Sequence, residues 1–181
     1  FLLIILGSIP LVIVGYIFYS TNLIDQFRNL KVVAWTTLIF GILLYFSDKF
    51  ELKNKISSEL NIKSIIIIGL FQILAIIPGV SRSGIVITAS RFLKFDRVES
   101  SKIAFYLSIP ALAGASVLGF KDVIDDQINF DAIFIFSTSA SFLFSYFTIK
   151  YFLIYVKMFS LSFFVIYRIV LSIILFSIIY L

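Results

Sequence analysis

The sequence predicts an all-α polytopic membrane protein that forms a single membrane domain over residues 1–181, with five transmembrane helices and one re-entrant helical hairpin. Its composition is 61% hydrophobic and only 14% charged, against roughly 25% charged residues in soluble domains. Long uncharged runs recur along the chain, and one pair of short apolar runs flanks a polar turn.

Five apolar runs are long enough to cross the hydrocarbon core of a bilayer. A helix rises about 1.5 Å per residue, so a core of about 30 Å needs about 20 residues. The expected spans are residues 1–19, 30–47, 98–120, 132–152 and 160–181. Arg168 is the only charge within the last of them.

Residues 64–95 do not fit the pattern of a full span. The run from Ser64 to Ile77 has only 14 residues, and the run from Gly84 to Phe92 is shorter still. Apolar runs of about 10–14 residues are typical of re-entrant or buried segments, and these two flank a turn that contains Pro and Gly. The pattern therefore predicts a helical hairpin that enters and leaves on one side of the membrane.

The distribution of Lys and Arg also favours the hairpin. With residues 48–63 on the cytoplasmic side, a hairpin places ten basic residues on that face and three on the outer face, whereas a single span would give five against eight. Cytoplasmic loops of membrane proteins are enriched in Lys and Arg. The net charge of +5 is thereby explained without a nucleic-acid partner.

The turn of the hairpin, residues 78–84, has the features of an anion-binding loop. Non-helical backbone at membrane depth persists only where protein, water or a ligand satisfies its polar groups. Pro78 disfavours helical geometry at the preceding residue, and Gly79 and Gly84 permit positive φ and close approach of the backbone to a ligand. Ser83 is expected to cap the second half-helix, whose N-terminus would face an anion.

Arg82 supplies a planar set of donors that suits phosphate oxygens, and the Ser81 hydroxyl adds another donor. An Arg within the membrane costs at least about 2.5 kcal/mol, so a partner is expected. Residues 64–95 contain no carboxylate that could neutralise it. The alternative is that Arg82 is a topology determinant in a short cytoplasmic loop, with the two serines as ordinary turn residues.

Three further polar residues have two interpretations each. Gln72 is either an interhelical hydrogen-bond partner or a brace for the turn, and Thr88 either bonds to its own helix or approaches the ligand. Arg168 lies too deep in its span for its guanidinium to reach the interface easily. It either pairs with a carboxylate or helps to bind the same anion, and the structural role is favoured.

The absence of Cys and His removes thiol chemistry, disulfides and imidazole bases from this chain. A complete metal site or a Ser–His pair is not expected within it. The chain begins at Phe1 inside an apolar run without a charged leader, so residues are expected to precede it.

The motifs of the hairpin resemble a known family. The run from Gly69 to Gly84, GLFQILAIIPGVSRSG, resembles the signature of bacterial undecaprenyl-diphosphate phosphatases, the bacitracin-resistance family. The resemblance continues through FYLSIPALAGA from Phe105 to Ala115 and FVIYR from Phe164 to Arg168. It covers nearly all of the chain and aligns it with roughly the C-terminal two-thirds of a family member, so the N-terminal third is expected to be missing.

The resemblance implies hydrolysis of undecaprenyl diphosphate to undecaprenyl phosphate and inorganic phosphate, which recycles the lipid carrier for cell-wall synthesis and confers bacitracin resistance. It implies catalytic roles for Arg82, Ser81 and Ser83. The residues expected to bind substrate are Gly79, Gly84, Gln72, Thr88 and Arg168. It further implies a divalent cation, Mg²⁺ or Ca²⁺, whose ligands are not identified in this chain. Members of the family also have a first re-entrant hairpin, inverted relative to this one, which carries two glutamates that are absent here, so this chain is expected to be half of an inverted-repeat architecture. These carboxylates would hold the cation or act as a base, and the fragment alone is expected to be inactive.

The chain departs from the family pattern directly after the loop. The family has a small residue and then Thr where this chain has Ile85 and Val86. This departure removes a hydroxyl near the phosphate, and Thr88 is a displaced substitute for it. The rate of hydrolysis or the geometry of the bound substrate is therefore expected to differ from that of the family.

Two other function classes stay open at this point. A transporter or lipid flippase would use paired inverted hairpins in the same way, and a structural membrane subunit would leave Arg82 without a substrate. The expected partners are a polyprenyl diphosphate lipid and the bilayer of the bacterial plasma (inner) membrane, with a homo-oligomer compatible with the sequence.

Overall fold

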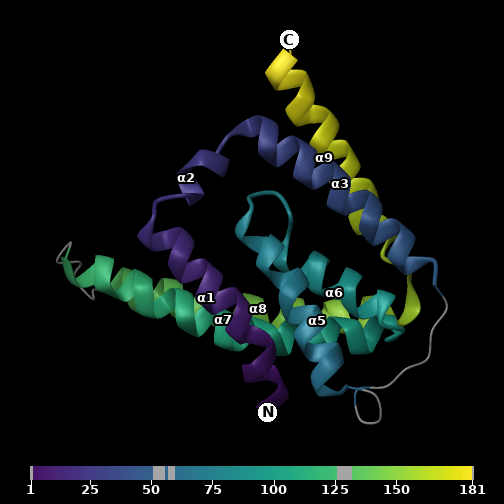
Figure 1. Ribbon diagram of the computed structural model, residues 1–181, viewed down its shortest axis with the longest axis horizontal. Coiled ribbons are helices and arrows are strands. Elements are labelled where there is room, and N and C mark those ends of the chain that lie inside the picture. Colours follow the sequence, from purple (N-terminus) through teal and green to yellow (C-terminus); the bar gives the residue numbers. More distant parts are fainter. Residues whose placement is uncertain (1, 51–55, 57–59, 126–131, 181) are drawn as a thin grey trace.

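The computed structural model describes residues 2–50, 56, 60–125 and 132–180, and every long element in this part of the chain is a helix (Figure 1). The predicted all-α class is confirmed. The helices are α1 (Leu2–Ser20), α2 (Ile24–Phe27), α3 (Leu30–Asp48), α5 (Ile62–Ile73), η1 (Leu74–Ile76), α6 (Arg82–Phe92), α7 (Arg97–Asp125), α8 (Ala132–Met158) and α9 (Ser162–Tyr180).

Four of these helices, α1, α3, α8 and α9, are long and apolar enough to cross a membrane. Their outward surfaces carry large apolar side chains, and α8 is exposed along almost its whole length. Exposed apolar helices of this length are stable in lipid and not in water. The chain is therefore a multi-pass membrane protein.

The helices surround the hairpin formed by α5, η1 and α6. In Figure 1, α3 and α9 lie side by side along one edge, and α1 crosses α7. Helix α5 packs closely against α1, where a Cβ on Gly69 would overlap the Gly7 carbonyl oxygen. Small residues at such a contact allow two helix backbones to approach each other.

The second half-helix of the hairpin is the most enclosed element in the described part of the chain. Every residue of α6 from Ile85 to Arg91 is buried, against α3, α5 and α7. Its apolar side chains join a core with Ile65, Ile68 and Leu107. The turn at its N-terminus is therefore held by protein on several sides, as backbone of irregular geometry in a membrane requires.

Candidate anion-binding site

The first half of the hairpin ends at the proline, as predicted. Helix α5 tightens into η1, and Ile77 has extended geometry with ψ 124°. Gly79 has φ +89°, which confirms the expected positive φ at this glycine. An L side chain would be strained there, and its Cβ would overlap the Thr36 hydroxyl. Pro78 and Gly79 together turn the chain from one half-helix to the other.

The prediction that Ser83 caps the second half-helix is wrong, because the cap is Ser81. Ser81 has φ 67°, and its Oγ accepts a hydrogen bond from the Gly84 amide at 3.3 Å. This positive φ lets the helix start at Arg82, two residues earlier than expected. Ser83 and Gly84 are therefore helical, and the positive φ considered for Gly84 is absent.

Two threonines of α3 hold the carbonyl groups of the turn. Thr36 Oγ1 lies 2.6 Å from the Pro78 carbonyl oxygen, and Thr37 Oγ1 donates to the Gly79 carbonyl at 3.4 Å. Neither residue was identified from the sequence. Two adjacent hydroxyls in the middle of an apolar span were the available signal, since polar side chains in membrane helices commonly bond to neighbouring segments.

Arg168 of α9, the helix beside α3, holds the same turn. Its Nη2 donates to the Gly79 carbonyl at 2.8 Å and its Nε to the Thr37 carbonyl at 3.3 Å. The side chain is 9% exposed, and no described carboxylate pairs with it. The alternative that Arg168 pairs with a carboxylate is therefore wrong among the described residues, because backbone carbonyls take that place.

The amides at the start of α6 are left free by this arrangement. The first helical hydrogen bond runs from the Ile85 amide to the Ser81 carbonyl at 3.0 Å, so the amides of Arg82 and Ser83 have no partner within the helix. All peptide bonds described are trans, so the Gly79 amide points away from the Pro78 carbonyl, which faces Thr36. The carbonyl groups of the turn therefore face α3 and α9, while the backbone amides remain available as donors for an anion.

The turn separates two pockets. A pocket of about 150 Å³ is lined by Ser81, Ser83, Gly84 and Arg168, together with apolar side chains of α3, α8 and α9. Arg82 instead faces a cavity of about 530 Å³ between α1, η1 and α7. The structure thus brings Arg168 to the two serines and places the Arg82 side chain on the other face of the turn.

Arg82 has no hydrogen bond or ion pair within the described part of the chain. It is the first residue of α6 and is partly buried. The residues that share its cavity are apolar or small, apart from two tyrosines: Leu11, Val12, Gly15, Tyr16, Tyr19, Ala75, Ile76, Ala111, Gly114, Ala115 and Val117. A guanidinium among such neighbours lacks a counter-charge, which an anion would supply.

Neither Gln72 nor Thr88 lines either pocket. Gln72 is 0% exposed, and both polar atoms of its side chain lack a described hydrogen-bond partner. Thr88 Oγ1 donates to the Gly84 carbonyl at 2.8 Å, so it bonds to its own helix. Ile85 and Val86, where the chain departs from the resembled pattern, are both buried in the core. Thr88 therefore does not replace the missing hydroxyl at the turn.

The described residues contain no group of three His, Cys, Asp or Glu side chains that could hold a metal ion. The described residues that line the two pockets include no carboxylate. The donor set of the turn consists of hydroxyls, amides and two guanidinium groups, which suits an anion and not a cation.

A family model matches almost the whole chain. Residues 1–174 match the model described as bacitracin resistance protein BacA. The hairpin, the turn and Arg168 all lie within the matched residues.

Curated relatives named undecaprenyl-diphosphatase are similar over the same region. The chain is 59% identical to one from Pelagibacter ubique over 98% of its own length and 70% of the relative's. It is 42% identical to one from Elusimicrobium minutum over 96% of its length and 65% of the relative's. A third, from Jannaschia sp., is 39% identical over 67% of this chain and 46% of the relative. The chain thus spans about half to seven tenths of the lengths of these relatives.

Proposed function

Because the chain belongs to the bacitracin resistance protein BacA family, we propose that it forms the anion-binding part of an undecaprenyl-diphosphatase. The reaction hydrolyses undecaprenyl diphosphate to undecaprenyl phosphate and inorganic phosphate. It recycles the lipid carrier for cell-wall synthesis and confers resistance to bacitracin.

One observation carries this proposal: Arg82, which pairs with no described residue, is a partly buried guanidinium at the first turn of α6 and faces an apolar cavity. A polyprenyl diphosphate matches both features, since its diphosphate offers oxygens to Arg82 and its hydrocarbon chain fits apolar walls. The free amides of Arg82 and Ser83 add donors on the same turn. The helix N-terminus and the guanidinium therefore act on one anion.

In the proposed reaction Arg82 neutralises the negative charge that spreads over the phosphoryl oxygens during transfer. Catalysis of phosphoryl transfer depends mainly on positioning and electrostatic stabilisation. A guanidinium that is fixed before the substrate arrives needs little reorganisation during the reaction. Ser81 caps the helix that carries Arg82, and the Ser83 hydroxyl lines the smaller pocket, so it would contact the diphosphate only from that side of the turn.

In this proposal the backbone of Gly79 and Gly84 forms part of the anion-binding turn, and the structure supports the two residues in different ways. Gly79 makes the turn through its positive φ. At Gly84, a Cβ would lie 3.1 Å from Ser81 Oγ and 3.7 Å from Arg168 Nη1, so the bare backbone leaves the serine side of the turn open. Arg168 supports this turn by donating a hydrogen bond to the Gly79 carbonyl.

The proposed membrane arrangement has five spans and one re-entrant hairpin in the bacterial inner membrane. Helix α7 is the fifth span: its 29 residues give a length of about 43 Å, enough for a hydrocarbon core of about 30 Å. Its first turns carry Arg97, Glu99 and Lys102, which suit the cytoplasmic interface. A divalent cation, Mg²⁺ or Ca²⁺, and a homo-oligomer remain parts of the proposal.

Reconstituted liposomes test the proposal against transport. The full-length protein is inserted into vesicles that contain undecaprenyl diphosphate, and both phosphate release and movement of the lipid between leaflets are measured. Phosphate release that requires Arg82 is expected. Lipid movement without phosphate release would instead favour a transporter or flippase.

A further inference from the structure

Asp48, the last residue of α3, has a buried carboxylate that joins two other parts of the chain to this helix. It is 7% exposed. Its Oδ1 accepts from Arg97 Nε at 2.6 Å and its Oδ2 from Arg97 Nη2 at 3.1 Å, at the start of α7. Oδ2 also accepts from the Leu161 amide at 2.9 Å, directly before α9. One side chain therefore ties the ends of α3, α7 and α9 together.

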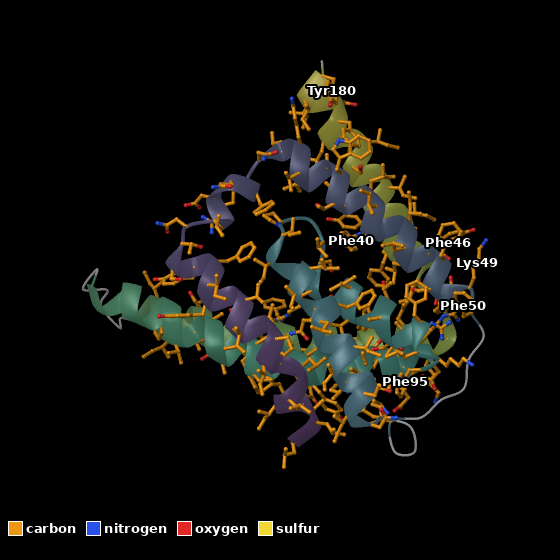
Figure 2. All side chains as sticks on the ribbon, viewed as in Figure 1. Phe40, Phe46, Lys49, Phe50, Phe95 and Tyr180 are labelled. Atoms are coloured by element: carbon orange, nitrogen blue, oxygen red, sulfur yellow. The ribbon has the colours of Figure 1, made fainter. Side chains whose placement is uncertain are left out.

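Arg91 adds the end of α6 to the same cluster. Its side chain is 3% exposed, and Nη2 donates to the Asp48 carbonyl at 3.1 Å and to the Phe50 carbonyl. Nη1 donates to the Phe95 carbonyl at 3.1 Å, and Figure 2 labels Phe50 beside the end of α3 and Phe95 below it. Arg91 Nε lies 4.0 Å from Asp48 Oδ1, so the carboxylate also provides its nearest described counter-charge.

Helix α3 consequently holds α6 and α9 at two separate heights. Near the turn, the Thr37 carbonyl accepts from Arg168 of α9, and the Thr37 hydroxyl donates to Gly79, which leads into α6. At the other end, the Asp48 carboxylate accepts from the Leu161 amide directly before α9, and the Asp48 backbone carbonyl accepts from Arg91 of α6, whose Nε lies 4.0 Å from the carboxylate. Residues 37 and 48 are 11 positions apart, so these two levels are separated by about 16 Å along α3.

We propose that Asp48 is a positioning residue for the anion-binding turn, an inference that rests on the proposed function. Two helices that are each fixed at two heights cannot slide or tilt independently. This constraint keeps the Gly79 carbonyl opposite Arg168 and keeps the first turn of α6 facing the Arg82 cavity. Loss of the carboxylate removes its contacts with Arg97 and Leu161 and the counter-charge beside Arg91, so the start of α9 is no longer fixed against α3 and α6 and the turn loses its fixed geometry.

The physical case for positioning is stronger than a case for stability alone. Burying an ion pair costs desolvation that its attraction often only offsets, so a buried pair is weak evidence of a large stabilising effect. Directional contacts from one carboxylate to two chain segments instead select one arrangement of the helices. Asp48 does not line either pocket, so it acts through the turn and not on the substrate.

A double-mutant cycle in the full-length protein tests the proposal. Asp48→Asn keeps the shape of the side chain and removes its charge, and is expected to lower kcat/KM for phosphate release by about tenfold, because small misplacements at a reacting centre are costly. In an Arg168→Lys background, where the turn is already loosened, the same change is expected to cost less than about threefold. If Asp48→Asn lowers kcat/KM by the same factor in the wild-type and Arg168→Lys proteins, the proposal is overturned.

The control is Asp25→Asn, which removes an exposed carboxylate from its pair with Arg28 and is expected to leave kcat/KM unchanged. If Asp48→Asn does not fold, Arg97→Gln weakens the same attachment from a side chain that is 36% exposed. Its expected loss of kcat/KM is again smaller in the Arg168→Lys background. Wild-type kcat/KM in folded Arg97→Gln would count against the proposal.

A second measurement is independent of catalysis and separates the two proposals. Spin labels at Phe92→Cys on α6 and Ile166→Cys on α9 report the distance between the two helices, and the chain has no other Cys. A narrow distance distribution that broadens in Asp48→Asn supports the positioning role even if no phosphate is released. An unchanged distribution contradicts the positioning role even if the enzyme is active.

Discussion

Arg168 donates a hydrogen bond of 2.8 Å to the backbone carbonyl of Gly79, which precedes it by 89 positions in the chain. This contact joins the last helix to the tip of the hairpin. It also directs the carbonyl groups of the turn away from the side on which an anion would bind.

Arg168→Lys tests this contact. A lysine carries its donors on one nitrogen and cannot reproduce the fork that bonds to both Gly79 and Thr37. We expect kcat/KM for phosphate release by the full-length protein to fall by about tenfold. Arg28→Lys, at an exposed position, is the matched control. An Arg168→Lys enzyme with the activity of wild type would show that the contact does not support the turn.

Gly79→Ala tests the geometry of the turn. Gly79 has φ +89°, and a Cβ there would lie 2.8 Å from the Val33 carbonyl oxygen. We expect a loss of roughly 1–3 kcal/mol in the free energy of unfolding, with a parallel loss of phosphate release. Thermal unfolding in detergent measures the first effect. Gly119→Ala, at a helical glycine with open space around it, should leave stability within about 1 kcal/mol of wild type.

Thr36→Val tests the clamp from α3. The change keeps the shape of the side chain and removes the hydroxyl that lies 2.6 Å from the Pro78 carbonyl. We expect a loss of about 1 kcal/mol in stability and slower phosphate release. Thr138→Val removes an exposed hydroxyl that bonds to its own helix, and should have no effect on activity. Equal rates of phosphate release by the two variants would show that the Thr36 hydroxyl does not support the turn.

Gly114→Leu tests the assignment of the 530 Å³ cavity to the hydrocarbon chain of the substrate. A Cβ at Gly114 would lie 3.8 Å from Val12 Cγ2, so a leucine extends into the cavity without a backbone clash. We expect KM to rise for undecaprenyl diphosphate and to change less for a short-chain prenyl diphosphate. Gly119→Leu, outside the cavity, is the control. A KM that rises equally for both substrates would show that the hydrocarbon chain of the substrate does not bind in this cavity.

The sequence predicted the helical class and the end of the first half-helix for reasons that are local. Apolar composition requires helices in lipid, and Pro78 restricts the residue before it. The motif at residues 78–84 identified the turn in the same way. These features depend on residues that are neighbours in the chain.

The sequence could not reveal which way the side chains of the turn point. We expected three consecutive residues, Ser81, Arg82 and Ser83, to contact the same phosphate group. The early start of α6 instead directs the arginine and the serines to different pockets. The support from Thr36 and from Asp48 was missed because it comes from a helix that lies 42 to 43 positions earlier in the chain than its partners on the hairpin.

Phosphate release from undecaprenyl diphosphate by the full-length Arg82→Lys variant tests the central claim most directly. Lysine keeps the positive charge but not the planar set of donors, so we expect a fall in kcat/KM of at least about 100-fold, with Arg28→Lys at the wild-type value. Wild-type turnover by the Arg82→Lys and Arg82→Ala variants would contradict the assignment of Arg82 as the residue that binds the diphosphate.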